Sequence, residues 1–317
     1  MDKLKEKSVV IGGCAKNVGK YIPDVFENIK KICKLFGKYK IIIYENDSTD
    51  NTLQQLMQLK NNISYYYHGD PARNNFFWEY PTTMRLQNTS WDVHDVHDYC
   101  NNNTYVDTND RNIKSYICNG HSKQKLNGDN NFNPDDITII SETNVNQKYH
   151  GRTVVLAHAR NVIVNTVLEK YDDYNYFINL DLDDVCSNPI NLDNFISIFD
   201  IQEWDAITFN REGYYDIWAL RHKSCTNCWN HPENINYVIE KRKEIIDLLN
   251  KSNLVHVYSA GNGFVLYKIN KIKNCSYDGI NKEEPRLISL DCEHVNFHKE
   301  MIEKNNANIY ISSLKLF

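Results

Sequence analysis

The stretch of sequence that decides the fold reads Tyr176-Phe-Ile-Asn-Leu-Asp181-Leu-Asp183-Asp184-Val185. Its apolar first half predicts a buried β-strand, and the acids that follow must lie at the carboxyl edge of a sheet, where α/β proteins bind ligands. A turn must begin at Asp181 for its side chain to meet that of Asp183, because residues two apart on extended chain share a face without converging. Converged, the two carboxylates form a hard oxygen site for Mn²⁺ or Mg²⁺ that can bridge a diphosphate. Capping of a turn before residues 191–199 is the alternative interpretation.

The segments around this strand alternate between strand-like and helix-like patterns. Strands are predicted at 7–11, 40–44, 63–67, 176–180, 206–209 and 263–267, and helices at 17–36, 52–59, 154–171 and 237–249. Alternation of this kind implies parallel βαβ units with right-handed crossovers. We therefore expect an α/β fold with a mixed, mostly parallel sheet flanked by helices.

The pattern weakens over residues 81–150, where Asn, Asp, Thr and Lys dominate. A structureless segment of this length is unusual inside a compact domain, so we expect a partly ordered polar insertion within a single domain spanning 1–317. Two pairs in it, His97 with Cys100 and Cys118 with His121, have spacings that suit a structural zinc site. Chance pairing is the alternative in a chain with nine Cys and 11 His.

The composition narrows the class of protein. Hydrophobic residues make up 41% of the chain, enough for a core of normal size, and the net charge of −5 argues against a nucleic-acid partner. No segment reaches the ~18 consecutive apolar residues of a membrane span, and no secretory signal is visible. We therefore expect no membrane span and a cytoplasmic location. A location in the Golgi lumen would require an additional N-terminal anchor.

Two further stretches carry chemistry. Glu45-Asn-Asp47-Ser48-Thr-Asp50-Asn-Thr52 follows the second predicted strand, and its acids can accept hydrogen bonds from a ribose diol or a base edge. Capping of the next helix by Ser48 and Asp50 is the simpler role. Arg152 and Arg160 lie eight residues apart, about two helical turns, and either guanidinium could clamp a diphosphate. A surface salt bridge is the alternative, and it suits Arg152 better.

These motifs together resemble a known family. Four motifs occur in the same order as in the nucleotide-binding half of GT-A glycosyltransferases, especially the family 2 type. They are the loop after the first strand, then Glu45-Asn-Asp-Ser-Thr-Asp-x-Thr52, then Leu156-Ala-x-Ala-Arg160-Asn161, and then Leu180-Asp-Leu-Asp-Asp184. The resemblance covers about 8–185 without the insertion. It implies the Rossmann-like GT-A fold, a UDP- or GDP-sugar donor, and a metal site at Asp181 and Asp183. The donor nucleotide would lie against Cys14, Ala15, Asn17, Glu45, Asp47, Arg160 and Asp181.

The later part of the chain, 186–317, would then supply the acceptor side. Tyr214-Tyr-Asp216-Ile-Trp218-Ala-Leu-Arg221 and Cys228-Trp-Asn230 are similar to the fungal capsule-associated α-1,3-mannosyltransferase family, although that family usually has Asn-Asp-Val where this chain has Asp183-Asp184-Val185. Aromatic faces stack on sugars and polar groups bind their hydroxyls. The expected acceptor-binding residues for a glycan or other hydroxyl acceptor are Asn210, Tyr215, Asp216 and Trp218. Core packing is the alternative for Trp218.

The C-terminal motif is Asp291-Cys-Glu293-His294-Val-Asn-Phe-His298, preceded by Ser259-Ala-Gly261-Asn-Gly263. Resemblance to the family 2 enzymes implies that Glu293 is the base of an inverting transfer, with Asp291 as the alternative. His294 or His298 could complete the metal shell, or both could simply pack in the protein. Two other functions stay open: a nucleotidyltransferase or phosphotransferase on a related sheet, and an inactive protein that only binds a glycan.

Overall fold

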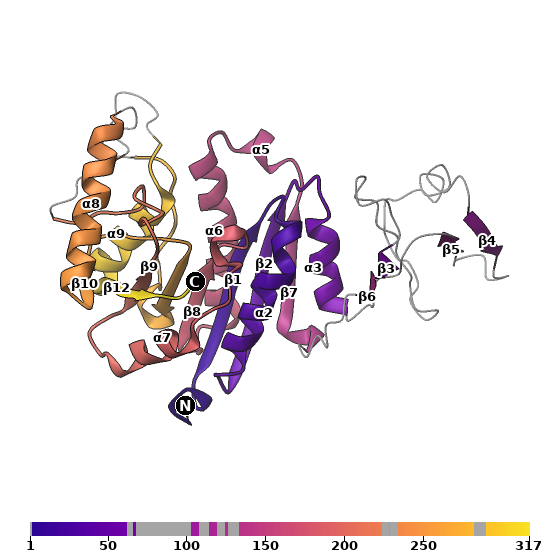
Figure 1. The fold of residues 1–317 in the computed structure, drawn as a ribbon, viewed down its shortest axis with the longest axis horizontal. Helices are drawn as coiled ribbons and strands as arrows, with labels where there is room; N and C mark the ends of the chain where they lie inside the picture. The colour runs from indigo at the N-terminus through magenta and orange to yellow at the C-terminus, as the bar shows by residue number, and fades with distance from the viewer. Residues whose placement is uncertain are drawn as a thin grey trace. The chain divides into compact units, whose positions relative to one another are not determined.

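The structure is a computed structural model that describes residues 2–61, 66–67, 103–107, 114–118, 124–125, 133–223, 228, 234–281 and 290–317. Contacts divide the chain into two compact units (Figure 1). The first comprises Met1–Leu56 with Asp135–Phe317, and the second comprises Met57–Pro134.

The first unit is built on one eight-stranded sheet with the strand order β10-β12-β9-β11-β8-β1-β2-β7. Strand pairs β1–β2, β1–β8, β2–β7 and β9–β12 are parallel, whereas β8–β11, β9–β11 and β10–β12 are antiparallel. This confirms the expected mixed, mostly parallel sheet. Its strands are β1 (Ser8–Ala15), β2 (Lys38–Asn46), β7 (Ile137–Glu142), β8 (Tyr176–Leu180), β9 (Ala206–Asn210), β10 (Leu254–Val257), β11 (Phe264–Lys268) and β12 (Ile309–Lys315).

Helices cover both faces of this sheet (Figure 1). Side chains of α6, α8 and α9 form one core cluster with alternate residues of the strands, including Val10 and Ile42. The neighbouring residues Val9 and Ile41 point to the opposite face by strand alternation, and α2 covers that face (Figure 1). The α-helices are α1 (Asp2–Lys5), α2 (Ile22–Cys33), α3 (Thr52–Asn61), α5 (Val145–Lys148), α6 (Arg152–Lys170), α7 (Leu192–Ser197), α8 (Ile235–Lys251) and α9 (Glu293–Asn305), and the short 3₁₀ turns are η1 (Gly19–Tyr21), η2 (Pro134–Asp136), η3 (Asp184–Cys186), η4 (Ile198–Asp200) and η6 (Ile269–Lys271).

The second unit contains two antiparallel strand pairs. They are β3 (Tyr66–Tyr67) with β6 (Gln124–Lys125), and β4 (Asn103–Asp107) with β5 (Lys114–Cys118). Of the suggested zinc ligands, His97, Cys100 and His121 lie outside the described residues, as does the side chain of Cys118.

The third strand of the parallel part is β7, which lies within the range predicted as an insertion. Ile137 pairs with Ile41 of β2, so β7 takes the place in the sheet that was expected for residues 63–67. Tyr66–Tyr67 pairs instead with Gln124–Lys125 in the second unit. The sequence pattern misses β7 because its apolar run is short and polar residues surround it on both sides.

The helix predicted over 17–36 is interrupted at its start. Asn17 has a left-handed φ of 54°, a short 3₁₀ turn follows, and α2 begins only at Ile22, with Pro23 in its first turn. Proline suits the first turn of a helix because its missing N–H would have no partner there. The loop before α2 is therefore longer than the amphipathic pattern indicates.

Gly12 of β1 lets α6 pack closely on the sheet. A Cβ atom at this position would lie 2.5 Å from Ile163 Cγ2 and 2.8 Å from Phe177 Cε2. Only glycine fits between these two buried side chains without displacement of one of them.

We expect Gly12→Ala to lower the free energy of unfolding by about 1–3 kcal/mol, because an added methyl overpacks this contact. Urea denaturation followed by circular dichroism measures the change. Lys38→Ala at the exposed start of β2 is the control and should change the free energy by less than about 0.5 kcal/mol. Equal stability of the Gly12→Ala and wild-type proteins would contradict this packing.

Candidate active site

The direction of the strand order reverses between β1 and β8. The chain runs from β1 to β2 and β7 on one side, and then returns through α6 to β8 on the other side of β1. Such a reversal of strand order is where open α/β sheets bind ligands, outside the carboxyl ends of the strands. Cys14 and Ala15 end β1, and Asp181 follows β8 directly. The predicted nucleotide-binding residues of β1 thus share one edge with the predicted metal-binding carboxylates.

A turn does begin at Asp181, as the spacing of the acids requires. Asp181 N donates to Gly263 O at 2.9 Å, and Asp183 caps η3 by accepting from Val185 N at 3.0 Å. Burial raises the pKa of Asp181, and burial together with the Asp181 charge raises the pKa of Asp183 to about 6. Both shifts reflect two partly buried carboxylates that lie close together and that a cation would stabilise.

Arg160 is the cation that lies against this edge. It belongs to α6, is 7% exposed, and donates through Nη2 to Asp181 Oδ1 at 3.1 Å and through Nη1 to Glu293 Oε1. Its guanidinium also lies 5.9 Å from the centre of the Tyr277 ring. Arg160 therefore joins the end of β8 to the start of α9.

The carboxylates of Asp181 and Asp183 suit a hard divalent cation that takes only some of its ligands from the protein. No group of three or more His, Cys, Asp and Glu side chains within the described ranges is arranged to hold a metal ion. Asp181 and Asp183 each use one oxygen for a protein hydrogen bond, which leaves Oδ2 of each for a cation. Mg²⁺ and similar ions are often bound by one or two carboxylates, with phosphate oxygens and water completing the shell. The residues present fit such an ion.

Polar residues of the β2–α3 loop hold the loop after β1 in place. Asn17 N donates to Ser48 Oγ at 3.1 Å, Val18 N to Thr52 Oγ1 at 2.8 Å and Gly19 N to Asp50 Oδ2 at 3.1 Å. In return, Asn17 Oδ1 accepts from Thr49 N at 2.8 Å. The Ser-Thr-Asp-x-Thr part of the motif therefore fixes the neighbouring loop, which follows the carboxyl end of β1.

Glu45 and Asp47, expected to bind the nucleoside, use their oxygens within the protein. Glu45 is 2% exposed and accepts from Ser48 N at 3.0 Å and from Ser141 Oγ at 2.6 Å. Asp47 accepts from the backbone N–H groups of Asn144 and Asn146 at 2.6 and 3.2 Å. Both acids therefore hold backbone or a hydroxyl group of neighbouring loops in place at this edge, and their contact with a nucleoside stays a prediction.

The two histidines of the C-terminal motif are buried in the core behind the site. His298 is fully buried, and both of its ring nitrogens are occupied, Nδ1 by Ser259 Oγ at 3.0 Å and Nε2 by Tyr267 OH at 2.9 Å. His294 is 4% exposed and stacks on His298 with ring centres 5.5 Å apart. His298 therefore has no ring nitrogen left for a metal ion, whereas His294 Nδ1 has no hydrogen-bond partner, so a metal-binding role for His294 stays a prediction.

The two candidate bases of that motif are both in ion pairs. Glu293, the first residue of α9, is 3% exposed and contacts Arg160. Asp291 is 8% exposed, pairs with Arg221 and also accepts from Cys292 N at 2.7 Å. Each carboxylate is thus held by an arginine from another part of the chain.

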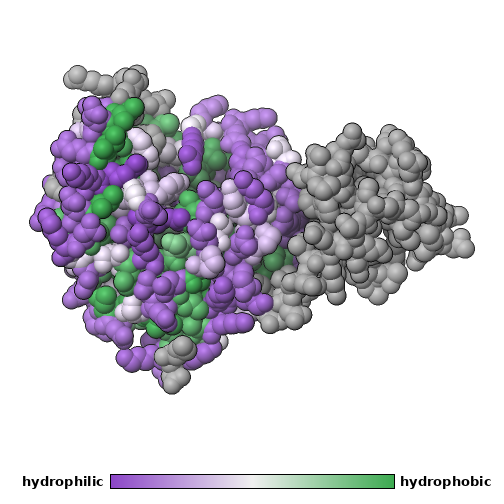
Figure 2. Space-filling model, in the orientation of Figure 1, coloured by the Kyte–Doolittle hydropathy of each residue, from purple (hydrophilic) through white to green (hydrophobic). Residues whose placement is uncertain are grey.

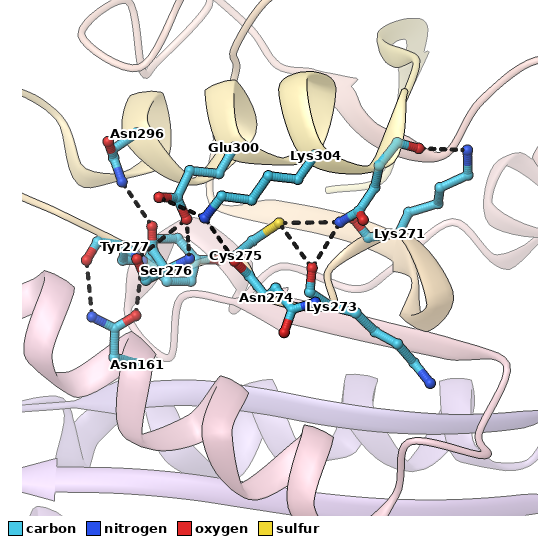
Figure 3. A network of polar contacts seen from close by, with 11 residues as sticks. Asn161, Lys271, Lys273, Asn274, Cys275, Ser276, Tyr277, Asn296, Glu300 and Lys304 are labelled. Carbon is cyan, nitrogen blue, oxygen red and sulfur yellow. Dashed lines mark hydrogen bonds and ion pairs between the residues drawn. The ribbon is translucent and has the colours of Figure 1, made fainter.

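A network of polar contacts joins α9 and α6 to the segment at 271–277 between them (Figure 3). Asn161 of α6 exchanges two hydrogen bonds with the backbone of Tyr277, at 2.9 and 2.7 Å. Glu300 of α9 accepts from Ser276 N at 2.7 Å, and Asn296 of α9 donates to Ser276 O at 3.0 Å. The segment at 276–277 therefore ties α6 to α9, and Arg160 and Glu293 lie on those same two helices.

The four expected acceptor-binding residues are separated by the fold. Tyr215 is 46% exposed, and partial burial together with the charges of Asp181, Asp183 and Asp216 raises its pKa to about 12, so Tyr215 and Asp216 lie beside the carboxylate edge. Trp218 packs against the core cluster, the alternative that the sequence left open. Asn210 is buried at the end of β9 and faces Ser313, which places it away from the surface.

Sequence reasoning missed the residues that bring Asp216 to this edge. Asn262, with a left-handed φ of 61°, accepts from Asp216 N at 3.1 Å and donates to Phe209 O at 2.6 Å. Arg221 donates to the carbonyls of Trp218 and Leu220, at 3.0 and 2.9 Å. The Gly-Asn-Gly sequence at 261–263 is the signal that could have indicated a tight, functional turn.

The surface of the first unit is predominantly hydrophilic on the face shown in Figure 2, with separate hydrophobic patches. In the parts of the chain that are described, no helix has the length and apolar character that crossing a membrane requires.

Comparison with known proteins finds similarity only at the level of structure. No family model matches the sequence, and no curated protein matches it. Residues 1–349 of S. aureus TarS are similar in structure, with 12% sequence identity and a TM-score of 0.40. The same protein in complex with UDP matches with 14% identity and a TM-score of 0.42. The mannosyltransferase PcManGT from Pyrobaculum calidifontis, in complex with GDP-Man and Mn²⁺, matches with 8% identity and a TM-score of 0.39. Each match covers 98% of this chain and 58% of the other. The chain therefore spans less than two thirds of the structures that it resembles.

The buried histidines predict a loss of stability in acid. Burial and the Arg160 charge lower the pKa of His298 to about 3, and burial lowers that of His294 well below its ordinary value. Below pH 6.5 the unfolded chain binds protons at these sites and the folded protein does not, so stability falls as pH drops from about 6.5 towards 3. His298 contributes about 1.4 kcal/mol per pH unit within that window, and His294 contributes in the same direction.

We expect His298→Gln to reduce the pH dependence of the free energy of unfolding between pH 6 and 4 by about 1.4 kcal/mol per unit. Urea titrations at several pH values measure the slope. His256→Gln, at an exposed position of β10, is the control and should keep the wild-type slope. The same slope in all three proteins would show that His298 is not held neutral.

Proposed function

We propose that this protein is a metal-dependent glycosyltransferase that moves a sugar from a UDP- or GDP-sugar to a hydroxyl acceptor. The observation that carries the proposal is the pair Asp181 and Asp183 at the point where the strand order reverses between β1 and β8. That point is where α/β sheets bind nucleotides, and the paired carboxylates are what a diphosphate-bound cation needs. The reaction class is that of the mannosyltransferase named above, but the proposal rests on this chain's own residues.

In the proposed complex, the nucleotide lies along the loop after β1, which the β2–α3 loop holds rigid. Asp181 and Asp183 would hold Mn²⁺ or Mg²⁺, which when bound would neutralise the charge of the leaving diphosphate. Arg160 orients Asp181 through the bond at 3.1 Å, and its charge opposes the rise that burial causes in the pKa of Asp181. Arg152, exposed at the start of α6, adds positive charge that reaches Asp181 and Asp216, and its side chain can contact the diphosphate.

Two features support a hydroxyl acceptor. Tyr215 offers an exposed aromatic face beside the carboxylate edge, which suits stacking on a sugar ring. The Asp216 side chain lies next to it and can accept a hydrogen bond from a hydroxyl group. Mannose is the sugar that the partial fungal similarity favours.

We expect Mn²⁺ with UDP or GDP to stabilise the wild-type protein and to have no such effect on Asp183→Asn. At 100 times its Kd a ligand adds about 2.7 kcal/mol, which thermal-shift measurement detects as a rise of several degrees. Asp184→Asn is the matched control, because Asp184 is the exposed neighbour, and it should respond like the wild type. Equal responses in both variants would contradict the assignment of Asp183, and no response to any nucleotide in the wild type would contradict the proposed function.

The products distinguish this function from nucleotidyl or phosphoryl transfer. A glycosyltransferase that hydrolyses its donor slowly releases the free sugar and a nucleoside diphosphate, because the bond to the anomeric carbon breaks. Cleavage within the diphosphate would release a nucleoside monophosphate and a sugar phosphate instead. Chromatography of the nucleotide products therefore separates the two enzyme classes, and absence of both products with nucleotide binding retained would indicate a binding protein.

A further inference from the structure

Asp216 reaches the carboxylate edge through a tight glycine turn. A Cβ atom at Gly261 would lie 2.6 Å from Asp216 Oδ2, and one at Gly263 would lie 3.6 Å from Asp181 Oδ2. The two carboxylates therefore contact positions only two residues apart on the same turn. The charge of Asp216 also raises the pKa of Asp181, which is further evidence that the two are close.

The backbone around Asp216 is fixed, whereas part of its carboxylate is available. Asp216 N donates to Asn262 Oδ1 at 3.1 Å, and Asp216 Oδ1 accepts from Ala219 N at 3.2 Å. The backbone N–H of Asn262 also stabilises the charged form of this carboxylate, and within the described part of the chain the carboxylate forms no ion pair. The Asp216 carboxylate is thus held in place by backbone groups and can still accept a proton.

The other two carboxylates considered as bases do not have this freedom. Glu293 is bound to Arg160, and Asp291 is bound to Arg221 and to Cys292 N. A carboxylate that is held in an ion pair with a guanidinium must give up that bond before it can accept a proton. Burial instead raises the pKa of Asp216, which strengthens its affinity for a proton.

We propose that Asp216 is the catalytic base that deprotonates the acceptor, and that Glu293 is a positioning residue that holds Arg160. The inference rests on the glycosyl transfer proposed above. As Asp216 Oδ2 takes the hydroxyl proton, the acceptor oxygen forms its bond to the anomeric carbon. The bond from that carbon to the diphosphate oxygen breaks, and the electron pair leaves with the nucleoside diphosphate. Asp216 then releases its proton to solvent.

The test uses donor hydrolysis, in which water replaces the acceptor and needs the same base. Release of nucleoside diphosphate is measured with Mn²⁺ and five donors: UDP-glucose, UDP-galactose, UDP-N-acetylglucosamine, GDP-mannose and GDP-fucose. With the donor that the wild type hydrolyses, we expect Asp216→Asn to lower kcat by at least about 100-fold. The Kd for the product nucleotide with Mn²⁺ should stay within about twofold, because Asp216 does not hold the donor.

Two further variants complete the comparison. Glu293→Gln removes a partner of buried Arg160, so we expect a lower Tm with kcat within about tenfold of wild type. Glu212→Gln, at an exposed carboxylate four residues before Asp216, is the matched control and should match the wild type in kcat, Kd and Tm. Gly261→Ala places a methyl group against Asp216 Oδ2 and should lower kcat with the nucleotide Kd unchanged, which provides the test if Asp216→Asn does not fold.

The outcomes separate the base assignment from the proposed function. A near-wild-type kcat in Asp216→Asn overturns the assignment of Asp216 as the base but does not affect the proposed glycosyltransferase function. If Asp216→Asn does not fold, a near-wild-type kcat in Gly261→Ala leads to the same conclusion. Loss of Mn²⁺-dependent nucleotide binding in Asp216→Asn also overturns it, since Asp216 would then belong to the donor site. A wild type that binds nucleotide with Mn²⁺ but hydrolyses none of the five donors overturns the base assignment, and one that does not bind nucleotide overturns both proposals.

Discussion

The buried guanidinium of Arg160 is the interaction on which the rest of the site depends. It lies between Asp181, at the end of β8, and Glu293, at the start of α9, residues that are far apart in the chain. A buried charge without a partner costs several kcal/mol, so the fold must bring both carboxylates to α6. This requirement aligns the end of the central strand, the helix behind it and the C-terminal helix around one charged group.

Most polar residues near the carboxyl ends of β1, β2 and β8 hold the backbone there in place. The Ser-Thr-Asp-x-Thr segment after β2 holds the loop after β1, and Asn262 holds the backbone of Asp216. Glu45 is bonded through both oxygens within the protein. Because so many side chains are bonded within the protein, the backbone at this edge of the sheet is held by several elements at once. Fixed backbone of this kind is what the positioning of a ligand requires.

The elements with strong, uninterrupted patterns could be predicted from the sequence, and those shaped by distant contacts could not. The predicted strand at 176–180 coincides with β8, and the predicted helix at 154–171 is close to α6. The strand β7 was missed because its pattern is short, and its place in the sheet depends on pairing with β2, far earlier in the chain. The helix expected over 17–36 starts late, because the loop before it is bound by the polar residues that follow β2.

The sequence by itself determined a βαβ sheet with paired carboxylates at its carboxyl edge, since strand pattern and acid spacing are local properties. Only the tertiary structure decided which acids are held in ion pairs. Glu293 and Asp291 have the spacing of a catalytic motif, yet each is bound by an arginine at least 70 residues away. Asp216 was expected from its motif only to bind an acceptor, and the structure shows that it has no ion pair among the described residues and lies against the glycine turn. The partner of a charged side chain depends on packing between distant elements, which residue order alone does not specify.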